Sequence, residues 1–184
     1  MATRQTGVRF RSDDVFAAPE DEYRYEVIDG ELYMSPAPGW GHQVCLSNLN
    51  LILGPTIKSR RLGKIVQAPT TVVLDDENAV QPDLLFISTA RQHLISARGV
   101  EGPPDLVVEA LSPRTRDNDL GLKMRRYARA RIPHYWVLDY ERREFLPYRL
   151  VGSAYVLIEG FPRGGTFQPD LFPGLEIPLD ELWD

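Results

Sequence analysis

Short apolar runs bounded by proline, glycine and polar residues predict buried strands along this chain. The stretch from Gln81 to Pro113 contains two of them, at residues 84–87 and 105–111, separated by a polar interval. A third run, at residues 134–139, has the same character. Apolar runs of this length between turn residues are typical of strands covered on both faces.

Two other regions alternate in polarity around turn residues and predict β-hairpins. Residues 23–28 and 31–34 flank Asp29-Gly30, a dipeptide that suits a type I′ turn. Residues 144–150 and 154–159 flank Val151-Gly152-Ser153 and predict an antiparallel hairpin near the C-terminus. Residues 64–74 predict an extended segment in which Pro69 marks an irregularity or a sheet edge.

Helical spacing is clearest at residues 41–60, which follow a proline-rich loop at 35–39. Four apolar residues share one stripe of this helix, and His42 falls on the same face in the first turn. Pro55 is expected to kink the helix or to mark its break near Leu51. The stripe consists of Leu46, Leu49, Leu53 and Ile57.

A second helix is expected from Thr115 or Asp117 to about Arg131, and it ends before Pro133. Its buried stripe consists of Leu120, Met124, Tyr127 and Ala128. We expect residues 89–102 to be helical or irregular. Residues 1–22 are expected to form an arm with a short helix at 13–18, and residues 161–184 a tail rich in proline and glycine. At 184 residues the chain predicts a single domain.

Two carboxylates interrupt the apolar pattern of the central strands. Asp83 stands at the entrance to the strand at 84–87, and Glu109 lies inside the strand at 105–111. Burying an ionised carboxylate without a partner costs roughly several kcal/mol. Glu109 therefore needs a cation, a set of hydrogen-bond donors or a metal ion. Carboxylates at adjacent strand ends suit Mg²⁺, which prefers oxygen ligands.

Each remaining candidate also has a simpler structural interpretation. Lys123 extends from the second helix beside the core, but it can also form an i,i+4 ion pair with Asp119, worth about 0.3–0.5 kcal/mol. Glu26 shares a strand face with Arg24, and an exposed carboxylate paired across the hairpin would explain it. His42 can be a structural residue of the apolar stripe. The polar segment Asp75-Asp76-Glu77-Asn78 predicts a solvated turn rather than a metal cluster.

Composition narrows the class of protein. A hydrophobic share of 43% and a charged share of 26% are those of an ordinary globular protein. No run of about 18 apolar residues or signal-peptide core is present, so we expect a cytoplasmic protein that does not enter the membrane. The single Cys45 excludes an internal disulfide or a cysteine-rich zinc site, and it is expected to be a small buried helix residue.

Charge is distributed unevenly along the chain. The net charge of −5 argues against non-specific coating of nucleic acid. Basic residues nevertheless gather after Pro113, where they are candidates for contacts with phosphates. These candidates are Arg114, Arg116, Arg125, Arg126 and Arg129.

At these residues the chain resembles the PD-(D/E)XK nuclease superfamily. Pro82-Asp83 matches the PD element, and Glu109 matches the acid of the second element. Over roughly residues 20–140 the chain is similar to one branch, the Uma-type family, whose mostly bacterial members are described as restriction endonucleases. The segments that carry this resemblance are 25–32, 80–84, 104–113 and 123–139.

The resemblance implies an α/β fold of the restriction-endonuclease type, with a mixed central sheet flanked by helices. It implies that Asp83 and Glu109 bind Mg²⁺ or Mn²⁺ and that Glu26 and His42 lie near the site. The lysine of the superfamily motif is absent, since Ala110-Leu111 follow Glu109. In the Uma-type branch a lysine on the next helix takes its place, which here is Lys123.

The expected function is that of a divalent-metal-dependent endonuclease that hydrolyses phosphodiester bonds in DNA and acts as a homodimer. In this interpretation Lys123 positions the attacking water. A catalytically inactive protein of the same fold, acting as a binding or assembly module, is the alternative. A glycosidase with paired acids is a third possibility, although the sequence places no aromatic platform beside the acids.

Overall fold

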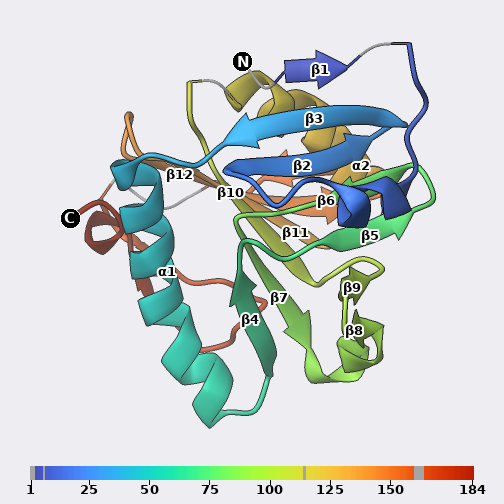
Figure 1. Cartoon of the computed structure of the whole chain (residues 1–184). Coiled ribbons are helices and arrows are strands. Elements are labelled where there is room, and N and C mark those ends of the chain that lie inside the picture. The colour runs from blue at the N-terminus through green and yellow to red at the C-terminus, as the bar shows by residue number, and fades with distance from the viewer. Residues whose placement is uncertain (1–2, 6, 114, 160–163) are drawn as a thin grey trace.

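Two mixed sheets form the body of the protein (Figure 1). The computed structural model describes residues 3–5, 7–113, 115–159 and 164–184. The six-stranded sheet contains β4 (Gly63–Gln67), β7 (Leu84–Ser88), β10 (Leu106–Ala110), β11 (His134–Asp139), β12 (Glu144–Val151) and β13 (Ala154–Leu157). Its strand order is β13-β12-β11-β10-β7-β4, and β10 and β11 are parallel.

The second sheet has seven strands and carries the N-terminal hairpin. Its strands are β1 (Thr3–Gln5), β2 (Tyr23–Ile28), β3 (Glu31–Pro36), β5 (Val72–Asp75), β6 (Asn78–Val80), β8 (Ile95–Ser96) and β9 (Gly99–Glu101). The order is β1-β3-β2-β6-β5-β9-β8, with β5 and β9 parallel. Near the C-terminus, β14 (Thr166–Phe167) pairs with β15 (Ile177–Pro178).

Helices are few, and the longest is α1 (Trp40–Ser59). A π-helical turn, η3 (Asn118–Lys123), continues directly into α2 (Met124–Arg129). The described part of the chain also contains three 3₁₀ segments: η1 (Ser12–Ala17), η2 (Thr89–Leu94) and η4 (Leu179–Leu182). In the ranges given above, no helix has the length and apolarity needed to cross a membrane.

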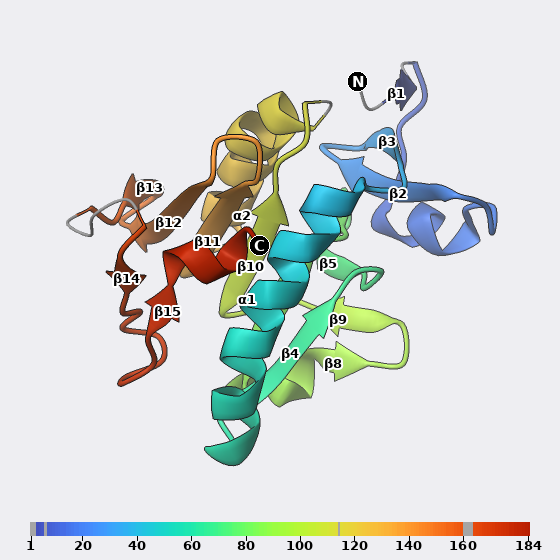
Figure 2. The same ribbon diagram turned by 90° about the vertical axis from the view of Figure 1, so that its left-hand side faces the viewer.

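The six-stranded sheet is covered on both faces, as its apolar strands require. Leu106 and Val108 of β10 belong to the core under α1, where the C-terminal segment also packs (Figure 2). Val107 and Leu111 belong to the opposite core, with α2 and the strands of the other sheet. Because side chains alternate along a strand, Glu109 lies on the α2 side.

The predicted fold class is confirmed, while several local expectations need correction. The extended segment at 64–74 is two strands, β4 and β5, which lie in different sheets. The excursion at 89–102 contains η2 and the short hairpin β8–β9. α1 is not broken near Leu51: it continues through Pro55, because buried Leu53 and Ile57 hold both sides of the proline in the core.

Candidate functional site

The pairing of β7 with β10 brings the two strand-borne acids together. The antiparallel pairing ends with Val108 opposite Leu84, so Glu109 and Asp83 are the next residues of the two segments at this end of the pair. The Asp83 carboxylate accepts a hydrogen bond of 2.9 Å from the backbone N–H of Ala110, the residue after Glu109. The two acids therefore lie close together where the β7–β10 pairing ends.

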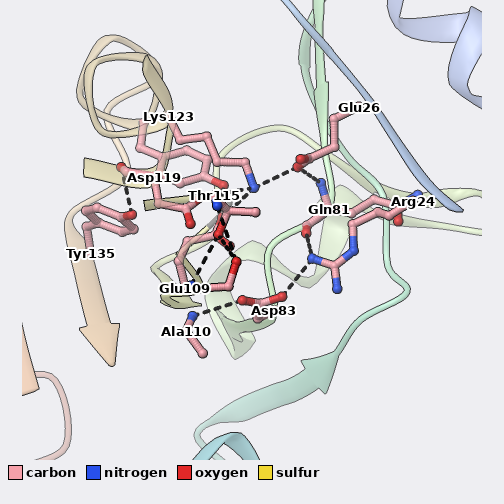
Figure 3. A network of polar contacts seen from close by, with 12 residues as sticks. Arg24, Glu26, Gln81, Asp83, Glu109, Ala110, Thr115, Asp119, Lys123 and Tyr135 are labelled. Carbon is pink, nitrogen blue, oxygen red and sulfur yellow. Dashed lines mark hydrogen bonds and ion pairs between the residues drawn. The ribbon is translucent and has the colours of Figure 1, made fainter. Parts of the chain in front are cut away.

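The pair faces a cavity of about 390 Å³ between the two sheets, where further charged side chains converge (Figure 3). β2 lies across this side of the six-stranded sheet and contributes two of them, and η3 contributes two more. The charged residues that line the cavity are Arg24, Glu26, Asp83, Glu109, Asp119, Lys123 and Glu141.

Lys123 is buried at the centre of three carboxylates. Its Nζ lies 2.8 Å from Oε1 of Glu26 and 3.0 Å from Oε1 of Glu109, but 3.8 Å from Oδ1 of Asp119. Burial alone would lower the pKa of Lys123, yet these acids outweigh it and raise the pKa above its ordinary value. The i,i+4 pair with Asp119 is thus the weakest of its contacts, and Lys123 faces the site.

Glu26 is buried, with 5% of its surface exposed, so its interpretation as an exposed carboxylate is wrong. Alternation along β2 puts Arg24 and Glu26 on the face that covers the site, as the period of two predicts. Besides Lys123, Glu26 accepts a hydrogen bond of 2.8 Å from the backbone N–H of Gln81, just before Asp83. Glu26 therefore connects the β2 strand to both the lysine and the PD element.

Asp83 is held from three sides. Nη1 of Arg24 lies 2.7 Å from Oδ1, and Nε2 of His42 lies 2.9 Å from Oδ2, the oxygen that also accepts from Ala110. Burial would raise the pKa of Asp83, but His42 and Arg24 outweigh it and hold the pKa well below its ordinary value. His42 therefore lies beside the site, and the same contact also fits a structural residue whose ring is satisfied by a hydrogen bond.

Glu109 has the opposite electrostatic character. Burial raises the pKa of Glu109 well above its ordinary value, and the negative charge of Asp83 adds to the rise. The positive charge of Lys123 acts in the opposite direction but is too weak to cancel these effects. The hydroxyl of Tyr127 donates a 2.5 Å hydrogen bond to Oε1 of Glu109. Tyr127 was expected only in the buried stripe of its helix, so this contact adds a role that periodicity did not indicate.

Asp119 is a buried acid whose part in the site the sequence did not reveal. Burial raises its pKa to about 6, against the opposing effects of Lys123 and of a hydrogen bond from Thr115. The spacing to Lys123 was visible, but it indicated only a surface ion pair. The additional signal would have been the apolar residues around Asp119, which place this turn against the core.

The charge balance of the cavity fits a divalent cation. Of the residues that the structure describes, five acidic side chains line the cavity but only two basic ones, those of Arg24 and Lys123, so acidic groups outnumber basic ones. No three His, Cys, Asp or Glu side chains within the described ranges form a group able to hold an ion by themselves. Mg²⁺ commonly takes one or two carboxylates together with water or substrate phosphates. Asp83 and Glu109 match that requirement.

Among the candidate arginines that the structure describes, Arg116, Arg125, Arg126 and Arg129 do not line the cavity. Arg116 pairs with Asp139, and Arg126 pairs with Asp29. Arg125 and Arg129 are exposed on α2, and Arg114 lies outside the described residues. Instead, Arg24 on β2 is the arginine that contacts Asp83. The sequence did not single it out.

Removal of the Tyr127 hydroxyl tests its support of Glu109. In Tyr127→Phe we expect about a tenfold loss of Mg²⁺ affinity, because groups that orient a metal ligand typically contribute this much. The free energy of unfolding should fall by about 1 kcal/mol. Calorimetric titration measures the first effect and thermal melting the second. Tyr155→Phe is the matched control, since it removes a hydroxyl that donates only to the Ile132 carbonyl; equal affinity losses in both variants would contradict the assignment.

Comparison with known proteins agrees with this fold. A family model named Uma2, with the description "Putative restriction endonuclease", matches residues 12–180. No curated protein matches the chain. Among solved structures, the chain is similar to a crystal structure from Anabaena variabilis described as "a putative nuclease belonging to DUF820". The two share 16% identity and a TM-score of 0.77, over 95% of this chain and 97% of the other.

Proposed function

We propose, because the chain belongs to the Uma2 family, that it is a divalent-metal-dependent endonuclease that cleaves DNA. One observation carries the proposal: Asp83, just before β7, and Glu109 of β10 line one cavity together with Lys123. Paired carboxylates with an adjacent ammonium are suited to phosphodiester hydrolysis.

Asp83 and Glu109 would hold Mg²⁺ or Mn²⁺. When bound, the ion supplies electrostatic stabilisation of the charge that develops on the phosphoryl group. The carboxylate of Asp83 is kept ionised and oriented by Arg24 and His42. Glu109 is oriented by the Tyr127 hydroxyl. The acids are thus fixed before a ligand arrives, which reduces the cost of ordering them on binding.

Lys123 would position the attacking water and stabilise developing negative charge with its ammonium group. Its raised pKa keeps it protonated, so it acts as a hydrogen-bond donor and a positive charge rather than as a base. Glu26 and Asp119 flank Lys123 and fix the direction of its Nζ. In this proposal Lys123 of η3 takes the role of the superfamily lysine that is missing after Glu109.

Exposed Arg125 and Arg129 on α2 are proposed to contact phosphates outside the cavity. Arg116 and Arg126 would do so only with their carboxylate partners still bound. The homodimer stays a prediction. An inactive binding module receives less support, because Lys123 lies closer to Glu26 and Glu109 than to Asp119.

The direct test is cleavage of single-stranded, duplex and supercoiled DNA with Mg²⁺, Mn²⁺ or a chelator. We expect cleavage that requires the divalent ion, together with saturable ion binding in calorimetry. Purified folded protein that binds neither ion and cuts none of these DNA forms would contradict the proposal.

Metal affinity should depend on pH. The pKa of Asp119 is raised to about 6 and that of Glu109 is also raised, so protons compete with the ion at low pH. We expect Mg²⁺ affinity to increase as the pH rises from about 5 to about 8, with protons released on binding. Calorimetry in two buffers of different ionisation enthalpy measures the released protons. An affinity independent of pH, with no proton release, would contradict this electrostatic account of the site.

A further inference from the structure

A second cavity adjoins the candidate site. It has a volume of about 340 Å³, within the range of about 300–1,000 Å³ that is typical of ligand pockets. Both cavities are lined by Arg24, His42, Asp83 and residues 36–38. A group in this second cavity would therefore lie beside Asp83 and the two side chains that hold it, those of Arg24 and His42.

The lining of the second cavity disfavours a phosphate. Asp21, Glu22 and Asp83 contribute negative charge, and Arg24 is already paired with Asp83. Like charges would repel an anionic phosphate at this distance. The same carboxylates can accept hydrogen bonds from a neutral ligand that carries amino groups.

The remaining lining suits a flat, polar-edged ring. Three amide side chains, those of Gln43, Gln67 and Gln81, provide both donors and acceptors. Tyr23, with 46% of its surface exposed, lies opposite Pro36 across the β2–β3 pair, and both line the cavity. An exposed ring beside a proline offers an apolar surface on which a base can stack.

We propose that the second cavity receives an unpaired nucleobase of the nucleotide next to the scissile phosphate. The base stacks on Tyr23, and its edge meets the glutamine amides and the carboxylates of Asp21 and Glu22. Amino-bearing bases (adenine, cytosine and guanine) are favoured over thymine. This inference rests on the proposed function and adds its substrate class: single-stranded or locally unpaired DNA, because a base inside a duplex cannot enter the cavity.

The test uses cleavage kinetics on single-stranded DNA with one abasic position moved through the nucleotides around the cut. For the wild-type protein, one abasic position should lower kcat/KM about tenfold, the equivalent of one stacked base. In Tyr23→Ala the intact substrate should show that same loss, and the abasic position should cause little further loss. Gln67→Ala should also lower kcat/KM on the intact substrate and reduce the further effect of the abasic position. It provides the test if Tyr23→Ala does not fold. Gln92→Ala, on η2 and in neither cavity lining, is the control with unchanged kinetics.

The possible failures are distinguishable. Cleavage that is equally efficient at every abasic position, or faster on intact duplex than on single strands, would overturn the base site while the proposed function stands. The base site would also be overturned if Tyr23→Ala and the abasic substitution lowered kcat/KM independently, so that their combined loss equalled the product of the two separate losses. No cleavage of any substrate would overturn both proposals.

Discussion

Asp83→Asn and Glu109→Gln are each expected to reduce DNA cleavage at least about a hundredfold, or about 2.7 kcal/mol of transition-state stabilisation. Each substitution removes one charged ligand while it preserves the shape of the side chain. Cleavage rates at saturating Mg²⁺ measure the effect. Asp105→Asn is the matched control, because Asp105 precedes β10 at its other end and accepts a hydrogen bond from the Ser88 backbone. A wild-type rate in either site variant would contradict the metal-ligand assignment.

The same two variants should differ in the stability of the metal-free protein, because only Asp83→Asn should lower it. The pKa of Asp83 is lowered in the fold, so its ionised form contributes stability that is present above its ordinary pKa and is lost at lower pH. Asp83→Asn should therefore cost about 2 kcal/mol at neutral pH. The pKa of Glu109 is raised in the fold. The wild-type protein therefore loses stability as the pH rises from the ordinary pKa of a glutamate to the raised pKa of Glu109.

Glu109→Gln should accordingly melt at an equal or higher temperature than the wild-type protein when a chelator is present. Thermal melts of both variants at neutral pH measure this contrast. A residue that costs stability and supports activity is the pattern expected of a functional site. Destabilisation of equal size in both variants would contradict the electrostatic difference between the two acids.

Lys123→Met should have the largest effect on folding. The described residues contain no other cation within ion-pair distance of Glu26 or Glu109, so the variant leaves buried acids without their counter-charge. Removal of one partner from a buried charge cluster typically costs about 3–5 kcal/mol. Cleavage should also be lost.

The pH and metal dependence of this variant separate charge from packing. We expect Lys123→Met to be closer to wild-type stability near pH 5, where the acids take up protons, and to gain more from Mg²⁺ than the wild-type protein does. Thermal melts with Mg²⁺ or a chelator at two pH values provide the measurement. Lys58→Met, at an exposed position of α1, is the control. A melting temperature equal to that of the wild-type protein at high pH without metal would show that Lys123 does not balance these acids.

Local patterns predicted the parts of the site that lie on single elements. Asp83 and Glu109 stood out because each interrupts an apolar strand, and Lys123 followed from its place on the next helix together with the family resemblance. Arg24, Asp119 and Tyr127 were not predicted in their roles. Each acquires its role only when β2, η3 and α2 pack around the acids, and spacing along the chain does not specify these long-range contacts.

The division into two sheets was missed for a related reason. Residues 64–74 have one continuous extended pattern, but β4 pairs with β7 while β5 pairs with β6. The polarity pattern predicts that a segment is extended, but it does not predict with which strand the segment pairs. The β2–β3 hairpin was predicted correctly because its turn residues are local. The position of this hairpin over Asp83 and Glu109, which forms the cavity, depends on long-range contacts and was not predicted.

The most direct test of the metal site is an anomalous difference map from a crystal soaked in Mn²⁺. The account predicts a single strong peak between the carboxylates of Asp83 and Glu109, on the side of the sheet that faces Lys123. It also predicts that the peak is absent from crystals of Glu109→Gln. A map with no peak between these carboxylates, at an Mn²⁺ concentration that supports cleavage in solution, would contradict it.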